Sequence, residues 1–411
     1  MSPSKDKNLD RPLHVLYSFP HRLGGGRINS TAWEMINGAS DAGVDMLVCP
    51  ASVNTPLPPP IRVNSTLAPG NLRVPFRALG KMRTLRLHDY IVSRRLERLA
   101  GWVDVVHTWP VGALRTLKTA AKLGIPSVLE RPNAHTRYAY ESVRREAERI
   151  GVELPADDEY AFHKDVLERE EEEYLATDFL LCPSDFTIKT FIEKGIPAQK
   201  LLKHGYGFDE KAFYPDTSRK LASGEGLTML FAGVAAVRKG LHFALEAWFK
   251  SSAHEKGTFL IAGQVLPAYA ERFSGMLAHP SVRVLGQRSD LPDLMRQSDL
   301  LVLPSIEEGF GLVCVEAIGC GCVPLVSEAC TDVCKHMVNA LVHRIGDASE
   351  LARQIEMLEQ NRDLLARLRN ECIRTAANYT WKAAGRCLHD VYREALVRKQ
   401  SGSPNSGTLA Q

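Results

Sequence analysis

The 411-residue chain contains no apolar run of about 18 residues, the length that a helix needs to cross a bilayer. Its first ten residues, MSPSKDKNLD, also lack the apolar stretch of a secretory signal, so we expect a cytoplasmic protein. The nine cysteines are an odd number scattered through a long chain, which favours reduced thiols over a disulfide framework. The net charge is only +3, and this argues against nucleic acid as a partner.

Short apolar runs rich in Val, Ile and Leu alternate with longer segments of helical period. This alternation is typical of parallel sheets joined by crossover helices. The pattern starts afresh in the second half of the chain, so we expect two such sheets. The predicted strands are 13–19, 44–49, 103–108, 125–130 and 178–184, then 227–233, 258–263, 282–286, 299–305 and 322–327. The sequence therefore predicts an α/β protein with two doubly wound domains.

The boundary between these domains is predicted within residues 204–226, where turn-forming Gly, Pro and Ser cluster. We place the first domain at 1–205 and the second at 206–379. Apolar residues at three- and four-residue spacing predict an amphipathic helix at 380–399. Residues 400–411 contain almost nothing to bury and are predicted to be a disordered tail.

In open α/β sheets a ligand lies outside the carboxyl ends of the strands, where glycine-rich turns let the backbone approach it. Four turns of this kind follow predicted strands, at 21–27, 232–240, 262–264 and 306–311. These turns are the expected site of the chemistry.

The turn EEGFG precedes an apolar helix that is predicted to start near Gly311. Glu308 then stands in the loop, and Glu316 lies on the second turn of the helix. Free amides of Phe310, Gly311 and Leu312 could bind a phosphate, and each carboxylate could accept a pair of sugar or ribose hydroxyls. The alternative, a surface loop acid and a solvated helix position, stays open on spacing alone.

Arg238 and Lys239 follow a strand and a glycine-containing turn, directly before a helix of apolar period. They could reach the same crevice and neutralise a diphosphate, or they could simply be solvated on the surface. A set of four cysteines has spacings that zinc could use, but we interpret its members as small apolar residues: Cys320, Cys322, Cys330 and Cys334. No metal is predicted.

Several motifs taken together resemble the GT-B glycosyltransferases of the large retaining family 4. The stretch 307–327 carries that family's glutamate, seven residues and second glutamate. The stretch 233–240 carries its glycine, followed six positions on by lysine and glycine. Residues 181–215 resemble the stretch that leads into the family's interdomain linker, and 104–110 resembles a strand of its acceptor domain. The resemblance implies two Rossmann-like domains facing a cleft, with helix 380–399 completing the first.

The resemblance assigns roles to the residues of the two motifs. Glu316 would accept the ribose hydroxyls of a nucleotide, and Glu308 would contact hydroxyls of the transferred sugar. Amides around Phe310 and Gly311 would face the sugar and diphosphate. Lys239 would stabilise the leaving diphosphate.

One position departs from the family pattern. The family usually has an arginine directly after the glycine that corresponds to Gly233, but this chain has Val234. Our hypothesis is that Arg238 supplies the missing cation. His135 lies where family members often place a histidine near the transferred sugar, although a loop histidine is as readily structural. The family's glycine loop after the first strand corresponds to Gly24, Gly25 and Gly26.

The implied activity is retaining transfer of a sugar from a nucleotide-sugar donor, held mainly by the second domain, to a saccharide, glycan or lipid-linked acceptor held by the first. The resemblance implies neither a metal nor a cofactor. A non-catalytic carbohydrate-binding or scaffold protein is the alternative that the departure at Val234 favours, whereas the intact Glu308, Glu316 and Lys239 argue against it. A dinucleotide oxidoreductase is disfavoured because GGGR lacks the GxGxxG spacing.

The basic segment 73–102 places aliphatic residues at helical spacing among arginines. This pattern is typical of interfacial helices on anionic lipid, and equally of a helix packed on its own domain with arginines in water. Peripheral contact with the inner membrane face is therefore carried as a hypothesis.

Overall fold

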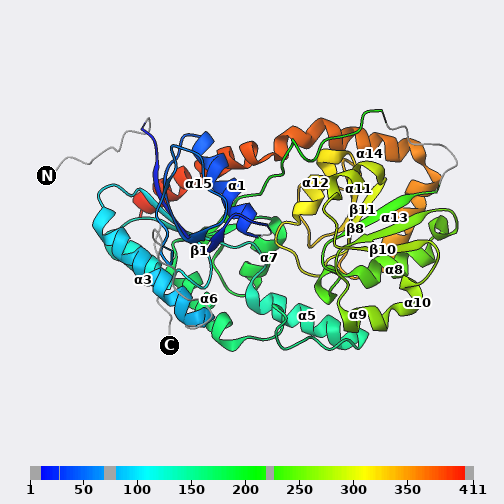
Figure 1. Cartoon of the computed structure of the whole chain (residues 1–411), viewed down its shortest axis with the longest axis horizontal. Coiled ribbons are helices and arrows are strands. Elements are labelled where there is room, and N and C mark those ends of the chain that lie inside the picture. The colour runs from blue at the N-terminus through cyan, green and yellow to red at the C-terminus, as the bar shows by residue number, and fades with distance from the viewer. Residues whose placement is uncertain (1–10, 27, 69–79, 219–225, 403–411) are drawn as a thin grey trace. The chain divides into compact units, whose positions relative to one another are not determined.

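The structure, a computed structural model, describes residues 11–26, 28–68, 80–218 and 226–402. It contains two parallel sheets, each surrounded by helices (Figure 1). The predicted fold class, α/β with two doubly wound sheets, is confirmed.

The first sheet has seven strands in the order β3-β2-β1-β4-β5-β6-β7. Its first strand, β1, pairs in parallel with both β2 and β4. The strands are β1 (His14–Leu23), β2 (Asp45–Val53), β3 (Arg62–Val63), β4 (Val105–Thr108), β5 (Ser127–Glu130), β6 (Phe179–Cys182) and β7 (Leu201–Lys203).

The second sheet has six strands in the order β10-β9-β8-β11-β12-β13. Its first strand, β8, likewise pairs in parallel with β9 on one side and β11 on the other. The strands are β8 (Thr228–Ala232), β9 (Thr258–Ala262), β10 (Val282–Gly286), β11 (Leu300–Leu303), β12 (Val323–Ser327) and β13 (Leu341–His343). In each sheet the strand order reverses beside the first strand, and such a switch point is where ligands bind in this architecture.

All ten predicted strands are present; β10 has the predicted bounds, and the others differ from the prediction by up to a few residues at their ends. The sequence missed β3, β7 and β13, which have two or three residues each and lie at sheet edges. Runs this short carry no measurable apolar alternation, so their pairing is decided by the neighbouring strand.

The connecting helices alternate with the strands along the chain. They are α1 (Ile28–Asp41), α3 (Lys81–Leu99), α4 (Leu114–Leu123), α5 (Thr136–Ile150), α6 (Lys164–Ala176), α7 (Asp185–Glu193), α8 (Leu241–Lys250), α9 (Pro267–Arg272), α10 (Ser274–Leu277), α11 (Leu291–Gln297), α12 (Leu312–Cys320), α13 (Ala348–Gln360), α14 (Arg362–Thr375) and α15 (Trp381–Gln400). Short 3₁₀ turns are η1 (Ala198–Lys200), η2 (Val237–Lys239), η3 (Ser252–Glu255) and η4 (Ala376–Tyr379).

The chain forms two compact units. The first contains the described residues up to Glu130, Glu168–Leu181 and those from Ala384 onward, and the second contains Arg131–Leu167 and Cys182–Ala383. Residues 131–167 and 182–205, which precede the predicted boundary at 205, thus pack with the second unit. Most of the predicted tail, from residue 403, lies outside the described residues.

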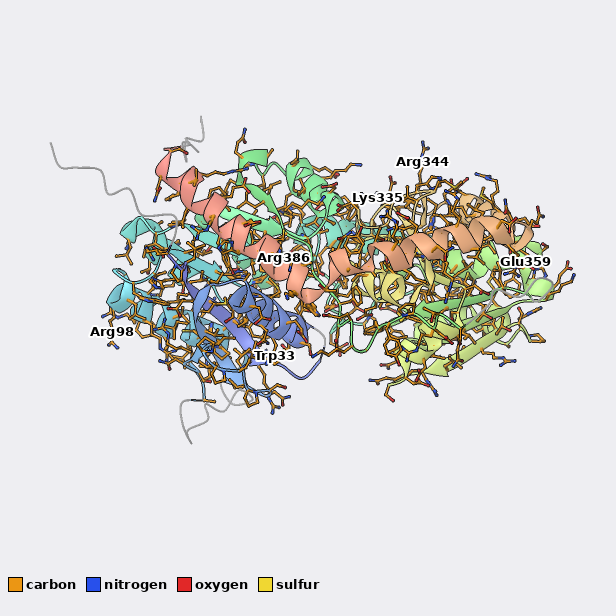
Figure 2. The ribbon with its side chains drawn as sticks, turned by 90° about the horizontal axis from the view of Figure 1, so that it is seen from above. Trp33, Arg98, Lys335, Arg344, Glu359 and Arg386 are labelled. Carbon is orange, nitrogen blue, oxygen red and sulfur yellow. The ribbon has the colours of Figure 1, made fainter. Side chains whose placement is uncertain are left out.

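The last helix, α15, packs in the first unit over most of its length. The hydroxyl of Tyr392 bonds Nδ1 of His107 at 2.8 Å, and Lys399 pairs with Asp178 at 2.6 Å. Arg386 is exposed on this helix (Figure 2). The apolar side predicted at 380–399 is therefore buried in the first unit.

Helix α3 contains the described part of the basic segment. Its apolar side is buried within the first unit, where Val92 and Leu96 join a core cluster with Leu16 and Val106. The arginines are mostly exposed, as Arg98 illustrates (Figure 2). The segment's first residues, 73–79, lie outside the described residues. Among the helices that the structure describes, none combines the length and apolarity needed to cross a membrane.

Candidate functional site

Two of the predicted turns meet at the switch point of the second sheet. The chain leaves β8 through Gly233 toward η2, and it leaves the neighbouring β11 toward the loop that contains Glu308. The amide of Ile306 donates to the carbonyl of Arg238 at 2.9 Å, which ties the two turns together. A Cβ on Gly240 would lie 2.1 Å from the carbonyl oxygen of Pro304, so the turns approach more closely than any side chain at 240 would allow.

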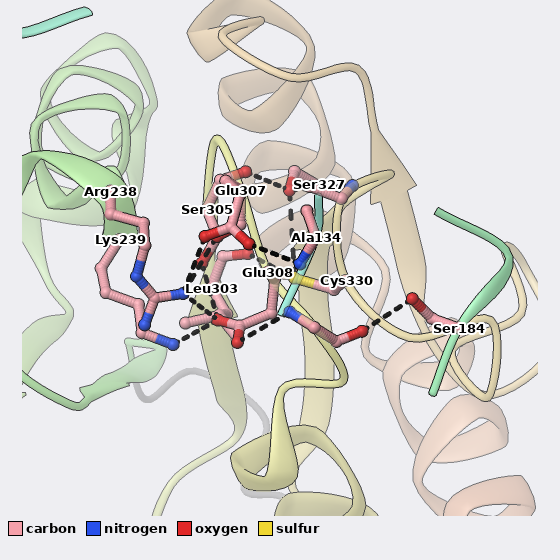
Figure 3. A network of polar contacts seen from close by, with 12 residues as sticks. Ala134, Ser184, Arg238, Lys239, Leu303, Ser305, Glu307, Glu308, Ser327 and Cys330 are labelled. Carbon is pink, nitrogen blue, oxygen red and sulfur yellow. Dashed lines mark hydrogen bonds and ion pairs between the residues drawn. The ribbon is translucent and has the colours of Figure 1, made fainter. Parts of the chain in front are cut away.

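Two cations and two carboxylates form a compact cluster where these turns meet (Figure 3). Lys239 forms an ion pair with Glu308. Nη1 of Arg238 lies 3.3 Å from Oε2 of Glu308 and 3.5 Å from Oε2 of Glu307, and it donates to the carbonyl of Glu307 at 3.1 Å. The guanidinium also stacks 4.8 Å from the ring centre of Tyr160. The structure therefore brings Arg238, Lys239 and Glu308 together, as the sequence predicts.

The two adjacent glutamates differ in their electrostatic setting. Burial alone raises the pKa of Glu308, but the charges of Lys239 and Arg238 outweigh it and lower this pKa to about 2. Glu307 is fully buried, and burial raises its pKa in spite of the charge of Arg238. Glu308 therefore stays ionised near neutral pH, and its charge is balanced by that of Lys239. Glu307 instead lies against Arg238.

Glu316 lies on the second turn of α12, which starts at Leu312 as predicted. Its carboxylate is partly buried, and burial raises its pKa to about 7. Among the described residues, the structure shows no hydrogen bond or ion pair to this carboxylate. A half-buried acid without a partner can accept a pair of ligand hydroxyls.

The N-terminus of α12 is open to an anion. Its N-cap is Gly311 at φ 73°, and no side chain of the described residues caps the first turn. The amides of Leu312 and its neighbours therefore point forward with the positive end of the helix dipole. The ring of Phe310 is buried against Tyr206, with ring centres 5.4 Å apart, so only its backbone is available to a ligand.

The loop that carries Glu308 is held on both sides of this residue. The carbonyl of Gly309 accepts a hydrogen bond from Oγ of Ser184 at 2.7 Å, and a Cβ on Gly309 would lie 1.6 Å from the carbonyl oxygen of Pro132. On the other side, the amide of Ala134 donates to Oε1 of Glu307 at 2.9 Å. These contacts fix the backbone from which the Glu308 side chain projects (Figure 3).

His135 is the N-cap of α5, and its Nδ1 accepts a hydrogen bond from the amide of Arg137 at 3.2 Å. The ring is buried against Phe191, with centres 5.1 Å apart. Burial, followed by the charges of nearby cations, lowers the pKa of His135 to about 3. The residue follows Ala134, whose amide reaches the cluster, but the Nδ1 of His135 itself caps a helix.

The remaining predicted residues lie in turns after strands. Gly233 donates its amide to the carbonyl of Ala262 at 2.9 Å. Val234 is 38% exposed and adds no charge to the cluster. The glycine loop lies in the first unit between β1 and α1, with φ of 77°, 94° and 101° at Gly24, Gly25 and Gly26.

Sequence reasoning assigned no role to Glu307, Tyr160, Ala134 or Ser184. A pair of adjacent glutamates in a loop is usually solvated, so nothing in the sequence indicated that Glu307 is buried. Tyr160 and Ala134 reach the cluster through contacts far apart in sequence, which no local pattern reveals. Ser184 could have been found as a helix cap, since a serine stands directly before the helical stretch that starts at Asp185, but its bond to Gly309 could not.

All nine cysteines are unbridged in the structure, and eight of them are buried. Among the residues described, no group of three or more His, Cys, Asp or Glu side chains is arranged to hold a metal. The cysteines near α12 pack as apolar core residues.

The two parallel sheets form the GT-B fold, which the chain shares with solved structures of about the same length. Residues 226–361 match the model of the family described as glycosyl transferases group 1. This segment contains both motif glutamates and both cations. The resemblance predicted from the motifs is confirmed.

Two solved structures share the fold over almost their whole length. Sucrose-phosphate synthase from Thermosynechococcus elongatus is 18% identical with a TM-score of 0.66, over 94% of this chain and 100% of that one. Anabaena Alr3699/HepE, solved in complex with UDP-glucose, is 16% identical with a TM-score of 0.61, over 94% of this chain and 99% of that one.

Curated relatives match over a shorter stretch. D-inositol 3-phosphate glycosyltransferase from Salinispora arenicola is 34% identical over 135 residues, which are 32% of this chain and 29% of that protein. The match thus spans less than a third of the relative's length. None of these three proteins is named as an oxidoreductase or a non-catalytic scaffold.

Proposed function

We propose that the protein is a glycosyltransferase that moves a sugar from a nucleotide-sugar donor to a saccharide, glycan or lipid-linked acceptor. The observation that carries this proposal is the Lys239–Glu308 ion pair beside the N-terminus of α12. No described side chain caps this N-terminus, and the carboxylate of Glu316 on the same helix has no partner among the described residues. A cation, free amides and two hydroxyl acceptors are what a sugar joined to a nucleoside diphosphate requires.

Within this proposal the donor is bound mainly by residues 206–379. Glu316 accepts the ribose hydroxyls, and the amides of Phe310, Gly311 and Leu312 face the diphosphate. Glu308 contacts hydroxyls of the transferred sugar. The turn at Gly233 borders the same site.

The acceptor is assigned to residues 1–205 together with helix 380–399, and the loop at Gly25 and Gly26 is assigned to the acceptor side below the diphosphate. His135 is assigned to the neighbourhood of the transferred sugar. Its support is its position next to Ala134, whose amide contacts Glu307.

We further propose that transfer retains the anomeric configuration and needs no metal or cofactor. The departing diphosphate takes the proton of the acceptor hydroxyl while Lys239 and Arg238 stabilise its charge. The state of the acids supports this scheme. Glu308 is bound by two cations and Glu307 is fully buried, so neither is placed as a free nucleophile for a covalent intermediate.

The test begins with thermal-shift measurements against UDP, GDP, ADP and NAD, followed by turnover of nucleotide sugars with glycan acceptors. UDP-glucose is the first donor to test, since the similar Anabaena protein is known in complex with it. We expect one nucleoside diphosphate to stabilise the protein and its sugar derivative to turn over. Stabilisation by NAD alone would overturn the proposal.

The finer claims need separate measurements. Proton NMR of the first product formed reports the anomeric configuration, and inversion would contradict retention. Turnover after chelation of divalent ions should be unchanged, and loss that Mg²⁺ restores would contradict metal independence.

Contact with a membrane through 73–102 stays a proposal of electrostatic attraction only, because the apolar side of α3 is buried in its own unit. Co-sedimentation with anionic vesicles at low salt tests it. Retention in the supernatant would remove it.

A further inference from the structure

A hydrogen-bonded chain of three side chains ends at the start of α8, directly after Arg238 and Lys239. The amide of His242, the second residue of α8, donates to the hydroxyl of Tyr269 at 2.6 Å. The same hydroxyl lies 2.7 Å from Nδ1 of His242. Tyr269 is fully buried in α9, so this contact holds the first turn of α8 from the protein interior.

The other end of the chain is Glu146 of α5, whose Oε1 lies 2.7 Å from Nε2 of His242. Burial raises the pKa of Glu146, but its hydrogen bonds to His242 and Arg149 lower it to about 2, so the carboxylate is ionised and can only accept. Nε2 of His242 therefore carries the proton. In the neutral ring Nδ1 is then an acceptor, and the hydroxyl of Tyr269 donates to it while accepting from the amide of His242.

The two side-chain hydrogen bonds run in the same direction. The hydroxyl of Tyr269 donates to Nδ1 of His242, and Nε2 of His242 donates to Glu146. The imidazole is also packed parallel to Phe273, at an angle of 14° and with ring centres 5.8 Å apart. A ring fixed in orientation and tautomer is a firm support for the backbone that carries it.

Helix α5 contacts both halves of the candidate site. The loop at its start supplies the Ala134 amide to Glu307, and three turns further on Glu146 reaches the start of α8. The loop that contains Glu307 and Glu308 (the acidic loop) and the turn that contains Arg238 and Lys239 (the cationic turn) are therefore both supported from α5 and the residues just before it. Loss of the Glu146 contact would leave the acidic loop supported and would remove one of the supports of the cationic turn.

We propose that Glu146, His242 and Tyr269 are positioning residues that fix Lys239 against Glu308 and the leaving diphosphate. This inference rests on the proposed function. None of the three touches the reacting atoms; they act through the start of α8.

The structure offers a matched control. Tyr392 in α15 is a second fully buried tyrosine whose hydroxyl bonds Nδ1 of a histidine, His107, at 2.8 Å, and it lies in the first unit. Tyr269→Phe and Tyr392→Phe thus remove the same type of contact. We expect both to lower the melting temperature, but only Tyr269→Phe to weaken binding of the nucleoside diphosphate, by about tenfold. Equal nucleotide affinity in the two variants would overturn the inference.

A second pair of variants tests the hydrogen bond between Glu146 and His242, and it remains informative if Tyr269→Phe folds poorly. Glu146→Gln keeps an oxygen that accepts from Nε2 and should retain most of the donor kcat/KM, whereas Glu146→Ala should lose several-fold. Similar loss in both variants would contradict positioning by the hydrogen bond.

Action through Lys239 is tested by a double-mutant cycle read as binding of the nucleoside diphosphate. Tyr269→Phe should weaken binding in the wild-type background and have no further effect in Lys239→Ala. Equal weakening in both backgrounds would overturn the inference. Absence of nucleotide binding and turnover in the wild type would instead overturn the proposed function, so the two failures are distinguishable.

Discussion

We predict that donor binding depends on pH near neutrality, because the carboxylate of Glu316 has no partner among the described residues and is assigned to the ribose in the proposed function. Burial raises its pKa to about 7 from the ordinary 4.5. In the proposed complex the ribose hydroxyls donate to the ionised form, so protonation of Glu316 would compete with the ligand. Above pH 7 the site is ready to bind, and below pH 7 binding must first release a proton.

The magnitude follows from the fraction ionised. With a pKa of about 7, roughly a tenth of the carboxylates are ionised at pH 6 and roughly nine tenths at pH 8, so affinity should rise about tenfold over this range if only the ionised form binds. The same shift affects folding with the opposite sign. Because the folded pKa is raised, Glu316 favours the folded state below pH 4.5, and this contribution, at most about 3 kcal/mol, disappears as the pH rises through 7.

The assay is isothermal titration calorimetry at pH 6, 7 and 8 with the nucleotide sugar that stabilises the protein best. Its diphosphate is esterified at both ends, so the ligand itself does not titrate in this range. Repeating the pH 7 titration in two buffers of different ionisation enthalpy measures the released proton, which should be about half an equivalent.

Two variants assign the effect. Glu316→Gln should bind about tenfold more weakly at pH 8 and lose the pH dependence. Glu308→Gln should keep it, because the pKa of Glu308 is about 2 and that group stays ionised throughout. A pH profile that survives in Glu316→Gln would refute the reasoning and would point to Glu307, the other acid of the site with a raised pKa.

Three further predictions concern the acidic loop and the cationic turn. Glu308→Gln should lower turnover at least tenfold while nucleotide affinity changes little, and an equal loss of both would contradict its assignment to the transferred sugar. Lys239→Ala should abolish turnover and Arg238→Ala should lower it strongly, since each leaves Glu308 with one cation fewer; unchanged turnover in Arg238→Ala would disprove the compensation hypothesis. Ser184→Ala should lower the free energy of unfolding by about 1 kcal/mol, measured by urea denaturation, because the buried carbonyl of Gly309 loses its shorter hydrogen bond.

Much of the fold was predictable because parallel strands buried on both faces have continuous apolar runs. The start of α12 at Leu312 was also predictable, since Gly311 ends an irregular turn and apolar helical residues follow. These signals are local. Glu308 and Glu316 could be placed relative to the helix for the same reason.

The support of the site could not be predicted, because it comes from contacts between distant segments. The amide of Ala134 and the carboxylate of Glu307 are 173 positions apart, and nothing in either segment specifies the other. The orientation of His242 likewise depends on Glu146, 96 positions earlier. His135 was selected by its position in the family pattern. Its ring also caps α5, and this role depends on local backbone geometry.

The contacts of Gly309 with Pro132 and Ser184 have a consequence for protein engineering. In a designed chimera of two-sheet proteins, the obvious junction lies between the sheets, here near residue 205. A splice at that point would separate Pro132 and Ser184 from the glycine that they contact, although all three belong to one compact unit. A second unit transplanted from this protein should therefore bring residues 131–167 and 182–205 with it, so the unit of exchange is discontinuous in the gene.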